Sequence, residues 1–350
     1  MPKTRWSVKL KGARGVSQRP PVVVGDHVLL TFNHGIGDYR STLLCVEIET
    51  GRELWRFEGD HSLNQPLIVE FNSIFISSFS GALYKLDMEG NLVWKSQPSR
   101  CSAWKAISCH DVVAYPEIAG QAKITWGLSK EDGSTRWMHL HGGHAYSLAS
   151  NSDLIVGSSV EHGMEANSST IYCVEGATGT LRWETIYPRY VFRPTILKEY
   201  VFVGSRGCIL CINLLTGVIV AQYEIEETVA VTQVPLATPW GVVFCAENGT
   251  ILSLNLVKVE SGVLDDPSYS FELNWKTHAD GGIESEPIFL DRHIFLIGES
   301  GKILILSAID GQVMASASIP RFERGFGLAI KGRDLIVSAS REALCIGSEI

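Results

Sequence analysis

The sequence lacks the features that would place it in a membrane or on nucleic acid. None of its apolar runs approaches the roughly 18–20 residues of a membrane-spanning helix. Its basic start, MPKTRWSVKLKGARG, has no continuous apolar stretch of the kind found in secretory signals. It has no Lys/Arg-rich run, and its formal net charge is −8, which disfavours a general surface for nucleic acid or anionic lipid. We therefore expect a cytoplasmic protein with neither a membrane nor a general nucleic-acid partner.

Motifs for nucleophilic catalysis and nucleotide binding are also missing. There is no Gly-x-Ser-x-Gly turn and no Gly-rich loop that precedes a helix. The eight cysteines should be mostly reduced in the cytoplasm. Cys208 and Cys211 form a C-x-x-C pair, but they lie in an alternating strand, where positions three apart face opposite sides. We interpret this pair as accidental rather than as a redox or zinc site.

What the sequence does contain is an internal repeat of about 40 residues. The segments TLLCVEIETGRELWRFE from Thr42, ALYKLDMEGNLVWKS from Ala82 and TIYCVEGATGTLRWET from Thr170 align on a turn glycine and a following tryptophan. Eight such segments occur, with starts 40, 40, 48, 38, 42, 52 and 40 residues apart. Another strand pair precedes most of them, as in PTILKEYVFVGS, and no helical periodicity persists. Each unit is therefore predicted to contain four short strands.

Four antiparallel strands in each unit of about 40–45 residues are typical of a propeller blade. We predict an all-β fold in which residues 1–350 form a single domain, an eight-bladed β-propeller of four-stranded antiparallel blades. The last unit, residues 324–350, has only three strands, whereas residues 3–10 form an orphan strand that carries Trp6. The N-terminal strand is therefore expected to complete the last blade, which removes the exposed sheet edges of an open array.

One position of the repeat holds tryptophan in six blades and alanine in two. These residues are Trp6, Trp55, Trp94, Trp137, Trp183, Ala221, Trp275 and Ala315. The large apolar area of an indole suits the seam between two blades. We predict that the tryptophans dock neighbouring blades together.

The pattern Gly-x-[apolar]-x-x-[apolar]-[Asp/Asn]-x-x-[Thr]-Gly-x-x-x-Trp resembles the pyrroloquinoline-quinone-like (PQQ-like) β-propeller repeat over essentially the whole chain. The resemblance implies the fold but says little about function, which lies in sites grafted onto the fold. The family includes quinone-dependent dehydrogenases, an outer-membrane assembly lipoprotein and cytosolic scaffolds. Its dehydrogenases hold the quinone beside a disulfide of adjacent cysteines and a Ca²⁺ ion, but this sequence has no adjacent cysteines. We expect a cytosolic, non-dehydrogenase member without a cofactor.

The segment before each inner strand of a propeller lies at one mouth of the central channel. In this sequence these segments are varied and contain charged, amide and aromatic side chains. The predicted ligand-binding residues are Arg19, Gln65, Trp104, Lys105, Tyr146, Arg193, Glu284, Glu286 and Arg324. Convergent polar groups at a concavity are the usual form of a ligand site, although a solvated polar funnel explains the same pattern.

A second candidate site lies in the fourth blade. The segment MHLHGGHAY contains His139, His141 and His144, and the loop SSVEHGMEANSS contains His162 and Glu165. We expect His144 to approach this loop, where imidazoles and a carboxylate suit zinc binding or general acid–base chemistry. Hydrated loop histidines are the alternative, and whether a metal binds stays open. His139 and His141 share one strand face, which we expect to be the exposed one.

Two functions are consistent with these observations. The favoured one is a scaffold or recognition module that binds a protein partner or a small ligand at the channel mouth, because no complete catalytic motif is present. The alternative is a cofactor-independent or metal-assisted enzyme that acts on a small molecule there, with His144, His162 and Glu165 as catalytic residues. An acidic and aromatic insertion, residues 257–271, is expected to project from the opposite face and to suit a partner contact.

Overall fold

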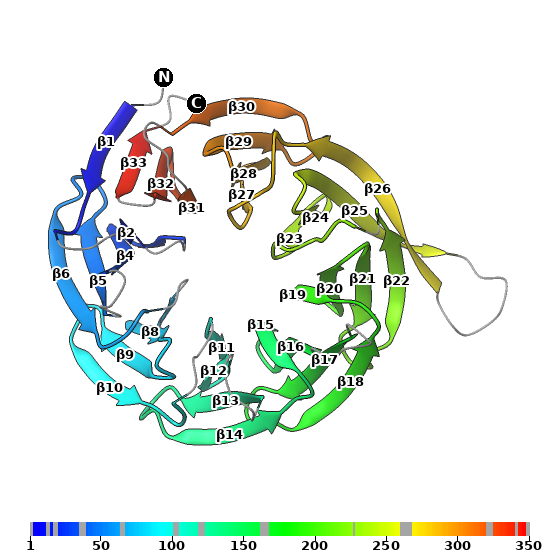
Figure 1. Cartoon of the computed structure of the whole chain (residues 1–350), viewed down its shortest axis with the longest axis horizontal. Coiled ribbons are helices and arrows are strands. Elements are labelled where there is room, and N and C mark those ends of the chain that lie inside the picture. Colours follow the sequence, from blue (N-terminus) through cyan, green and yellow to red (C-terminus); the bar gives the residue numbers. More distant parts are fainter. Residues whose placement is uncertain are drawn as a thin grey trace.

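The computed structural model describes residues 3–11, 15–16, 20–34, 40–63, 67–100, 105–117, 123–161, 168–226, 228–259, 268–319, 325–339 and 342–347. Within these ranges the chain forms strands and turns, and the strands make eight antiparallel sheets arranged in a ring (Figure 1). The described residues contain no helix long and apolar enough to cross a membrane. The predicted eight-bladed, all-β propeller is therefore confirmed.

The blades are numbered along the chain, and each runs from an inner to an outer strand. Blade 1 comprises β2 (Gly15–Val16), β3 (Val22–Val24), β4 (His27–Asn33), β5 (Ser41–Glu47) and β6 (Glu53–Gly59). Blade 2 comprises β7 (Ile68–Glu70), β8 (Ser73–Ser77), β9 (Leu83–Asp87) and β10 (Leu92–Ser96). Blade 3 comprises β11 (Ile107–Cys109), β12 (Val112–Pro116), β13 (Ile124–Ser129) and β14 (Thr135–Leu140). Blade 4 comprises β15 (His144–Ser150), β16 (Leu154–Glu161), β17 (Ser168–Glu175) and β18 (Leu181–Tyr187).

The second half of the ring repeats this order. Blade 5 comprises β19 (Val191–Leu197), β20 (Tyr200–Ser205), β21 (Cys208–Asn213) and β22 (Ile219–Glu224). Blade 6 comprises β23 (Leu236–Thr238), β24 (Gly241–Cys245), β25 (Thr250–Val259) and β26 (Ser268–His278). Blade 7 comprises β27 (Ile288–Leu290), β28 (His293–Ile297), β29 (Lys302–Ser307) and β30 (Val313–Ser318). Blade 8 comprises β31 (Gly325–Lys331), β32 (Asp334–Ala339), β33 (Ala343–Gly347) and β1 (Lys3–Val8).

The hydrophobic core lies in the seams between neighbouring blades. The middle strands are buried on both faces, as in β5, where six consecutive residues are buried. The outer strands instead alternate, as in β14, because one face meets the next blade and the other faces solvent. Each seam has its own cluster, such as the one that Val156 of blade 4 shares with Val203 of blade 5. The short apolar runs of the sequence are thus strands covered by a blade on each side.

Blade 8 joins the two ends of the described chain. β1 pairs antiparallel with β33, so that Lys3 lies opposite Gly347. Arg5 of β1 adds ion pairs with Asp334 of the same blade and with Glu49 of blade 1. The prediction that the N-terminal strand completes the last blade is confirmed.

Six seams are closed in the same way by a tryptophan. The Trp183 indole of blade 4 donates its Nε1–H to the carbonyl oxygen of Leu214 in blade 5, at 2.7 Å. Its ring lies against Gly217 of the same turn, which has a φ of +73°, and a Cβ there would lie 2.6 Å from the ring. Equivalent bonds join Trp6 to Ile48, Trp55 to Met88, Trp94 to Glu131, Trp137 to Gly176 and Trp275 to Ala308. The predicted docking role of the indoles is confirmed.

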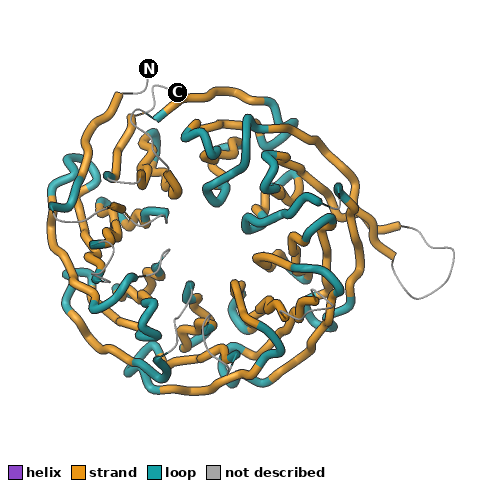
Figure 2. The backbone as a smooth tube through the Cα atoms, viewed as in Figure 1, coloured by secondary structure: helices purple, strands orange, loops and turns teal. Residues whose placement is uncertain are grey.

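The two alanine positions fall where the next blade has no tight turn between its third and fourth strands. Ala221 of blade 5 faces blade 6, in which β25 and β26 continue into a long hairpin that extends beyond the ring (Figure 1, Figure 2). Ala315 of blade 7 faces blade 8, in which β33 and β1 come from opposite ends of the chain. At either place, the described residues of the next blade include no turn glycine against which an indole could pack and no turn carbonyl group to accept its N–H, whereas the other six seams have both.

Aromatic side chains fill the seam between blades 5 and 6 instead. Phe271 of the hairpin lies 6.2 Å from Phe202 and 6.5 Å from Tyr223 between ring centroids. Tyr269 lies 5.6 Å from Tyr200. The base of the predicted insertion therefore contributes to blade packing, while residues 260–267 at its tip lie outside the described residues.

The described cysteines, seven in number, are free and buried. Cys208 belongs to the cluster between blades 4 and 5, and Cys211 belongs to the cluster between blades 5 and 6. Burial raises the pKa of both thiols, so neither is a reactive thiolate at neutral pH. The two thiols point into different seams, as predicted for positions three apart in a strand.

Candidate functional site

Three of the predicted ligand-binding residues meet although they belong to three separate blades. Lys105 precedes β11 of blade 3, Arg193 lies near the start of β19 in blade 5, and Glu286 precedes β27 of blade 7. They share the mouth face, on which the chain passes from each outer strand to the next inner strand. Arg193 donates from Nη1 to Glu286 Oε1 at 2.8 Å, and Lys105 Nζ lies 3.7 Å from the same oxygen. We call these three residues the mouth triad.

The mouth triad is partly shielded from water. Its side chains are between 25% and 27% exposed, so its charges interact more strongly than charges in bulk water do. Two cations share one carboxylate, which leaves a formal charge of +1. A guanidinium has five N–H donors in a planar fork, and the bond from Arg193 to Glu286 engages only Nη1. The triad therefore retains both charge and donors for an anionic group.

An irregularity in β19 places Arg193 at this point. Between Val191 and Pro194, β19 carries one more residue than its partner β20. Such a bulge bends the strand and changes the direction of a side chain, and Pro194 has no N–H group to leave unpaired. Ser158 of blade 4 donates its hydroxyl to the carbonyl oxygen of Phe192 at 2.7 Å. This bond from the neighbouring blade helps to hold the bulge in place.

The other predicted residues are not shown to join the triad. The backbone N–H of Glu284 donates to the carbonyl oxygen of Ile297 at 2.9 Å, and the role of its side chain stays a prediction. Tyr146 lies within β15, but its side chain is outside the described part of the structure. The predicted residues that lie wholly outside the described ranges are Arg19, Gln65, Trp104, Arg324, His162 and Glu165.

The prediction that His139 and His141 occupy an exposed face is wrong. His141 is 7% exposed and stacks on Tyr172 of blade 4, with 5.3 Å between ring centroids and 10° between planes. His139 contacts the same ring at 5.0 Å. Trp137 docks into blade 4, and residues two and four positions after it share its side of the strand. Both imidazoles are therefore turned into the seam between blades 3 and 4.

Burial keeps these two imidazoles neutral. His141 donates from Nδ1 to the carbonyl oxygen of Gly143 at 2.7 Å, so its Nε2 is an acceptor, and this atom has no partner among the described residues. The Nε2 atom of His139 is also buried without a hydrogen-bond partner among the described residues. Burial lowers the pKa of His141 to about 4 and also lowers that of His139. Protonation of either ring would place a charge in a closed seam.

The metal or acid–base hypothesis for blade 4 stays a prediction. His144 begins β15 and lies opposite Val160 of β16, but His162 and Glu165 are outside the described residues. Among the residues that the structure describes, no three His, Cys, Asp or Glu side chains are grouped so that they could hold a metal ion.

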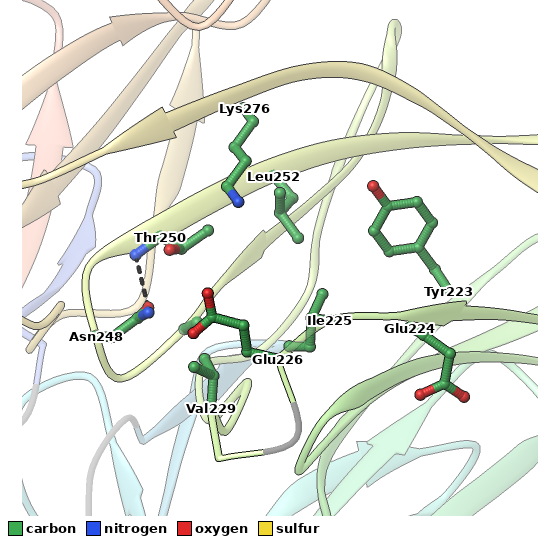
Figure 3. A pocket seen from close by; sticks show the side chains of 10 residues that line it. Tyr223, Glu224, Ile225, Glu226, Val229, Asn248, Thr250, Leu252 and Lys276 are labelled. Atoms are coloured by element: carbon green, nitrogen blue, oxygen red, sulfur yellow. Dashed lines mark hydrogen bonds between the residues drawn. The ribbon is translucent and has the colours of Figure 1, made fainter.

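A small pocket that sequence analysis missed lies between blades 5 and 6 (Figure 3). Its volume is about 110 Å³, which is room for a few water molecules. Val229 and Leu252 supply apolar lining, and Glu226 and Lys276 bring opposite charges to it. The pocket belongs to the seam that has alanine in place of tryptophan. Its size and mixed lining favour bound water over an organic ligand.

Seven blades have four strands, and blade 1 has five because both β2 and β3 pair with β4. These eight antiparallel blades and the Trp–Gly seams define a PQQ-like β-propeller. Two overlapping matches to the family model described as "Outer membrane protein assembly factor BamB" cover residues 3–139 and 40–189, which together make up more than half of the chain. The chain therefore belongs to this family of PQQ-like propellers. A search of curated proteins finds no match.

Solved structures resemble the whole ring. BamB from Moraxella catarrhalis is 15% identical, with a TM-score of 0.72, over 99% of this chain and 100% of that one. The computationally designed Ika8 protein is 14% identical, with a TM-score of 0.75, over 97% and 98%. A europium-containing methanol dehydrogenase is 12% identical, with a TM-score of 0.71, over 99% and 93%. An assembly factor, a designed protein and a methanol dehydrogenase share this fold, and at these identities the likeness concerns the fold alone.

Proposed function

We propose that this protein is a cytoplasmic recognition or scaffold module that binds a protein partner or a small ligand on its mouth face. The mouth triad is the observation that carries the proposal. Lys105, Arg193 and Glu286 come from blades 3, 5 and 7, which are not neighbours in the ring, so their ion pairs do not belong to any seam between adjacent blades. Polar groups that converge from several elements are the usual form of a binding site.

The chemistry of the triad indicates the kind of group that it binds. Its formal charge is +1, and Arg193 presents a planar donor fork that matches a carboxylate or phosphate. A carboxylate from a peptide or a small molecule would compete with Glu286 for Arg193 and Lys105. The ligand is therefore proposed to carry an anionic group.

The family supports a role in protein recognition. Its model is described as an assembly factor, and assembly factors act through contacts with other proteins. A cytoplasmic location is supported by the described cysteines, which are free thiols and so suit a reducing compartment.

The test is to identify the metabolites or proteins that co-purify with the protein and to measure whether their binding depends on the triad. Wild-type protein, Lys105→Ala and Arg193→Ala are purified under native conditions, and bound metabolites and proteins are identified by mass spectrometry. Each variant should lose at least about tenfold in affinity for the recovered ligand, roughly 1.4 kcal/mol, with a nearly unchanged melting temperature. Arg182→Ala, on the exposed face of the outer strand β18, is the control and should bind normally.

The opposite outcome has a clear meaning. If the triad variants bind normally while Asp265→Ala and Asp266→Ala in the blade 6 insertion abolish binding, the mouth face is not the binding face. The protein would then act as a scaffold through that insertion.

A further inference from the structure

The face opposite the mouth triad carries a groove that the proposed function does not use. It has a volume of about 820 Å³ and is formed by turns of blades 2, 3 and 4. We call it the turn groove. Its rim residues are Phe71, His110, Asp111, Glu131, Arg136 and Asp153. These turns join first to second strands and third to fourth strands, whereas the mouth triad lies at the other end of the blades.

Phe71 stands out when equivalent turns are compared. Blades 1, 2, 3, 5, 7 and 8 join their first two strands by a two-residue turn whose first residue has a positive φ. These first residues are Gly25, Phe71, His110, Lys198, Asp291 and Gly332. Five are glycine, charged or otherwise polar, which such turns favour. Phe71 alone in this set is a large apolar residue.

Neither folding nor packing explains the phenylalanine. Its side chain is 89% exposed, so it contributes little to the core. Its φ of +47° is unfavourable for a bulky residue. A glycine would relieve the backbone and a polar residue would be better solvated. Aromatic residues are enriched at protein interfaces, and this ring lies beside a groove.

The charges of the turn groove differ between its floor and its rim. We call the partly buried lining residues Glu70, Lys85 and Lys130 the floor of the groove. Lys130 forms an ion pair with Glu70 at 2.7 Å and also donates to the carbonyl oxygen of His110 at 2.6 Å. Lys85 donates to the carbonyl oxygen of Lys130 at 2.8 Å. The floor cations are thus engaged within the protein.

The rim is acidic. Asp111, Glu131 and Asp153 are exposed carboxylates, and Arg136 is the exposed cation that opposes them. His110 and Asp111 lie 3.2 Å apart between Nδ1 and Oδ1. At the rim, a partner side chain therefore meets the Phe71 ring and three exposed carboxylates, against one exposed guanidinium. The less exposed floor adds one carboxylate and two cations, Glu70, Lys85 and Lys130, so carboxylates exceed cations by one in the whole groove.

We propose that the turn groove docks a protein partner through a basic segment in which arginine or lysine lies next to an apolar side chain. The apolar side chain packs on Phe71, and the basic side chain forms ion pairs with Asp111 and Asp153. An arginine can in addition stack on the Phe71 ring. This site is independent of the mouth triad, so a partner held here leaves the mouth face free for its own ligand.

The test uses Phe71→Gly, a variant that should not harm the fold. Glycine adopts the φ of this turn without strain, so the melting temperature should stay the same or rise. Lys198→Gly makes the same backbone change in the equivalent turn of blade 5, outside the groove, and is the matched control. The probes are two fluorescein-labelled octapeptides, one with a Leu-Phe pair between two arginines and one with two glutamates in place of the arginines.

Binding is measured by fluorescence anisotropy. The arginine peptide should bind wild type and Lys198→Gly equally, and Phe71→Gly should reduce its affinity by at least about tenfold, as for an interface hot spot. Asp111→Asn should weaken binding less, and added salt should weaken it further. Equal binding of the glutamate peptide, unchanged binding to Phe71→Gly, or no binding of either peptide would overturn the proposal.

Discussion

The six seams with tryptophan and the two seams with alanine are built from the same strands but closed differently. Where tryptophan is present, the next blade offers a tight turn with a glycine and a free carbonyl group, as Gly217 and Leu214 do for Trp183. Where alanine is present, that turn is replaced by the hairpin of blade 6 or by the junction of the two chain ends. The tryptophan of one blade and the turn of the next are therefore one structural unit.

The alanine seams show that a seam needs packed area more than it needs an indole. Between blades 5 and 6 the area comes from aromatic residues such as Phe202 and Phe271. Between blades 7 and 8 it comes from aliphatic residues such as Ile305 and Val337. Each alanine seam is filled by side chains of its own, which do not repeat around the ring.

The largest effect is expected from removing the strand that supplies the tryptophan to blade 8. Deletion of residues 1–10 removes β1, its pairing with β33 and the docking of Trp6 into blade 1. We expect a sharp fall in melting temperature, or no soluble protein, because the ring is no longer closed. A deletion protein with the wild-type melting temperature would show that closure by β1 does not stabilise the ring.

Replacing a seam tryptophan by alanine, and a seam alanine by tryptophan, tests whether each residue suits only its own kind of seam. Trp183→Ala should cost about 3–5 kcal/mol of unfolding free energy, as for other buried aromatic residues. Ala221→Trp should also destabilise, by about 1–3 kcal/mol, because the seam is already filled and offers no glycine turn. Both values are obtained from denaturant titrations followed by circular dichroism. A stabilising Ala221→Trp change would contradict the idea that turn and tryptophan form one unit.

The contact between the tryptophan and the glycine turn of the next blade can be disrupted by adding a single methyl group to the glycine. Gly217→Ala combines a positive φ with a contact of 2.6 Å to the Trp183 ring, and should cost about 2–4 kcal/mol. Gly25→Ala is the matched control, because Gly25 also has a positive φ but nothing within 4 Å of the added atom. It should cost only about 1–2 kcal/mol, which is the cost of the left-handed backbone alone. Equal losses would mean that the backbone, and not the indole contact, requires the glycine.

The smallest effect is a pH dependence confined to the seam between blades 3 and 4. Burial lowers the pKa of His141 to about 4, whereas an unfolded histidine has a pKa of about 6.5. Between these values the unfolded state binds more protons, so the free energy of unfolding falls as the pH falls from 6.5 toward 4. The loss at pH 5 should be about 2 kcal/mol.

His141→Phe isolates this contribution because it keeps the ring stacked on Tyr172 but cannot be protonated. The difference in melting temperature between pH 7.5 and pH 5 should be smaller for the variant than for the wild type. An unchanged difference would assign the acid sensitivity to other groups.

The repeat was enough to predict the fold because the period recurs eight times and six of the eight blades keep the tryptophan. The pairing of residues 3–10 with the last unit could also be predicted, since one unit lacked a strand and the orphan strand carried Trp6. The buried orientation of His139 and His141 could have been predicted from the sequence. Both lie an even number of positions after Trp137 and therefore share its inward face.

The candidate sites were less predictable because they depend on features that do not repeat. The position of Lys105, Arg193 and Glu286 before inner strands predicted a common face. It did not predict that they would touch, since the bulge in β19 leaves no clear signal in the sequence. The turn groove was missed because Phe71 becomes unusual only when its turn is compared with equivalent turns whose φ values are known.

The pairing of β1 with β33 has a consequence for biosynthesis. The ribosome releases β1 long before β33, and at about 5–20 residues per second the two are separated by roughly 20–70 s. During that interval β33 is not available to pair with β1. A second nascent chain nearby presents the same unpaired strand, and its β1 fits the last blade of the first chain as well as the native one does. Exchange of this strand between neighbouring copies on one messenger RNA is thus a misassembly that this pairing permits.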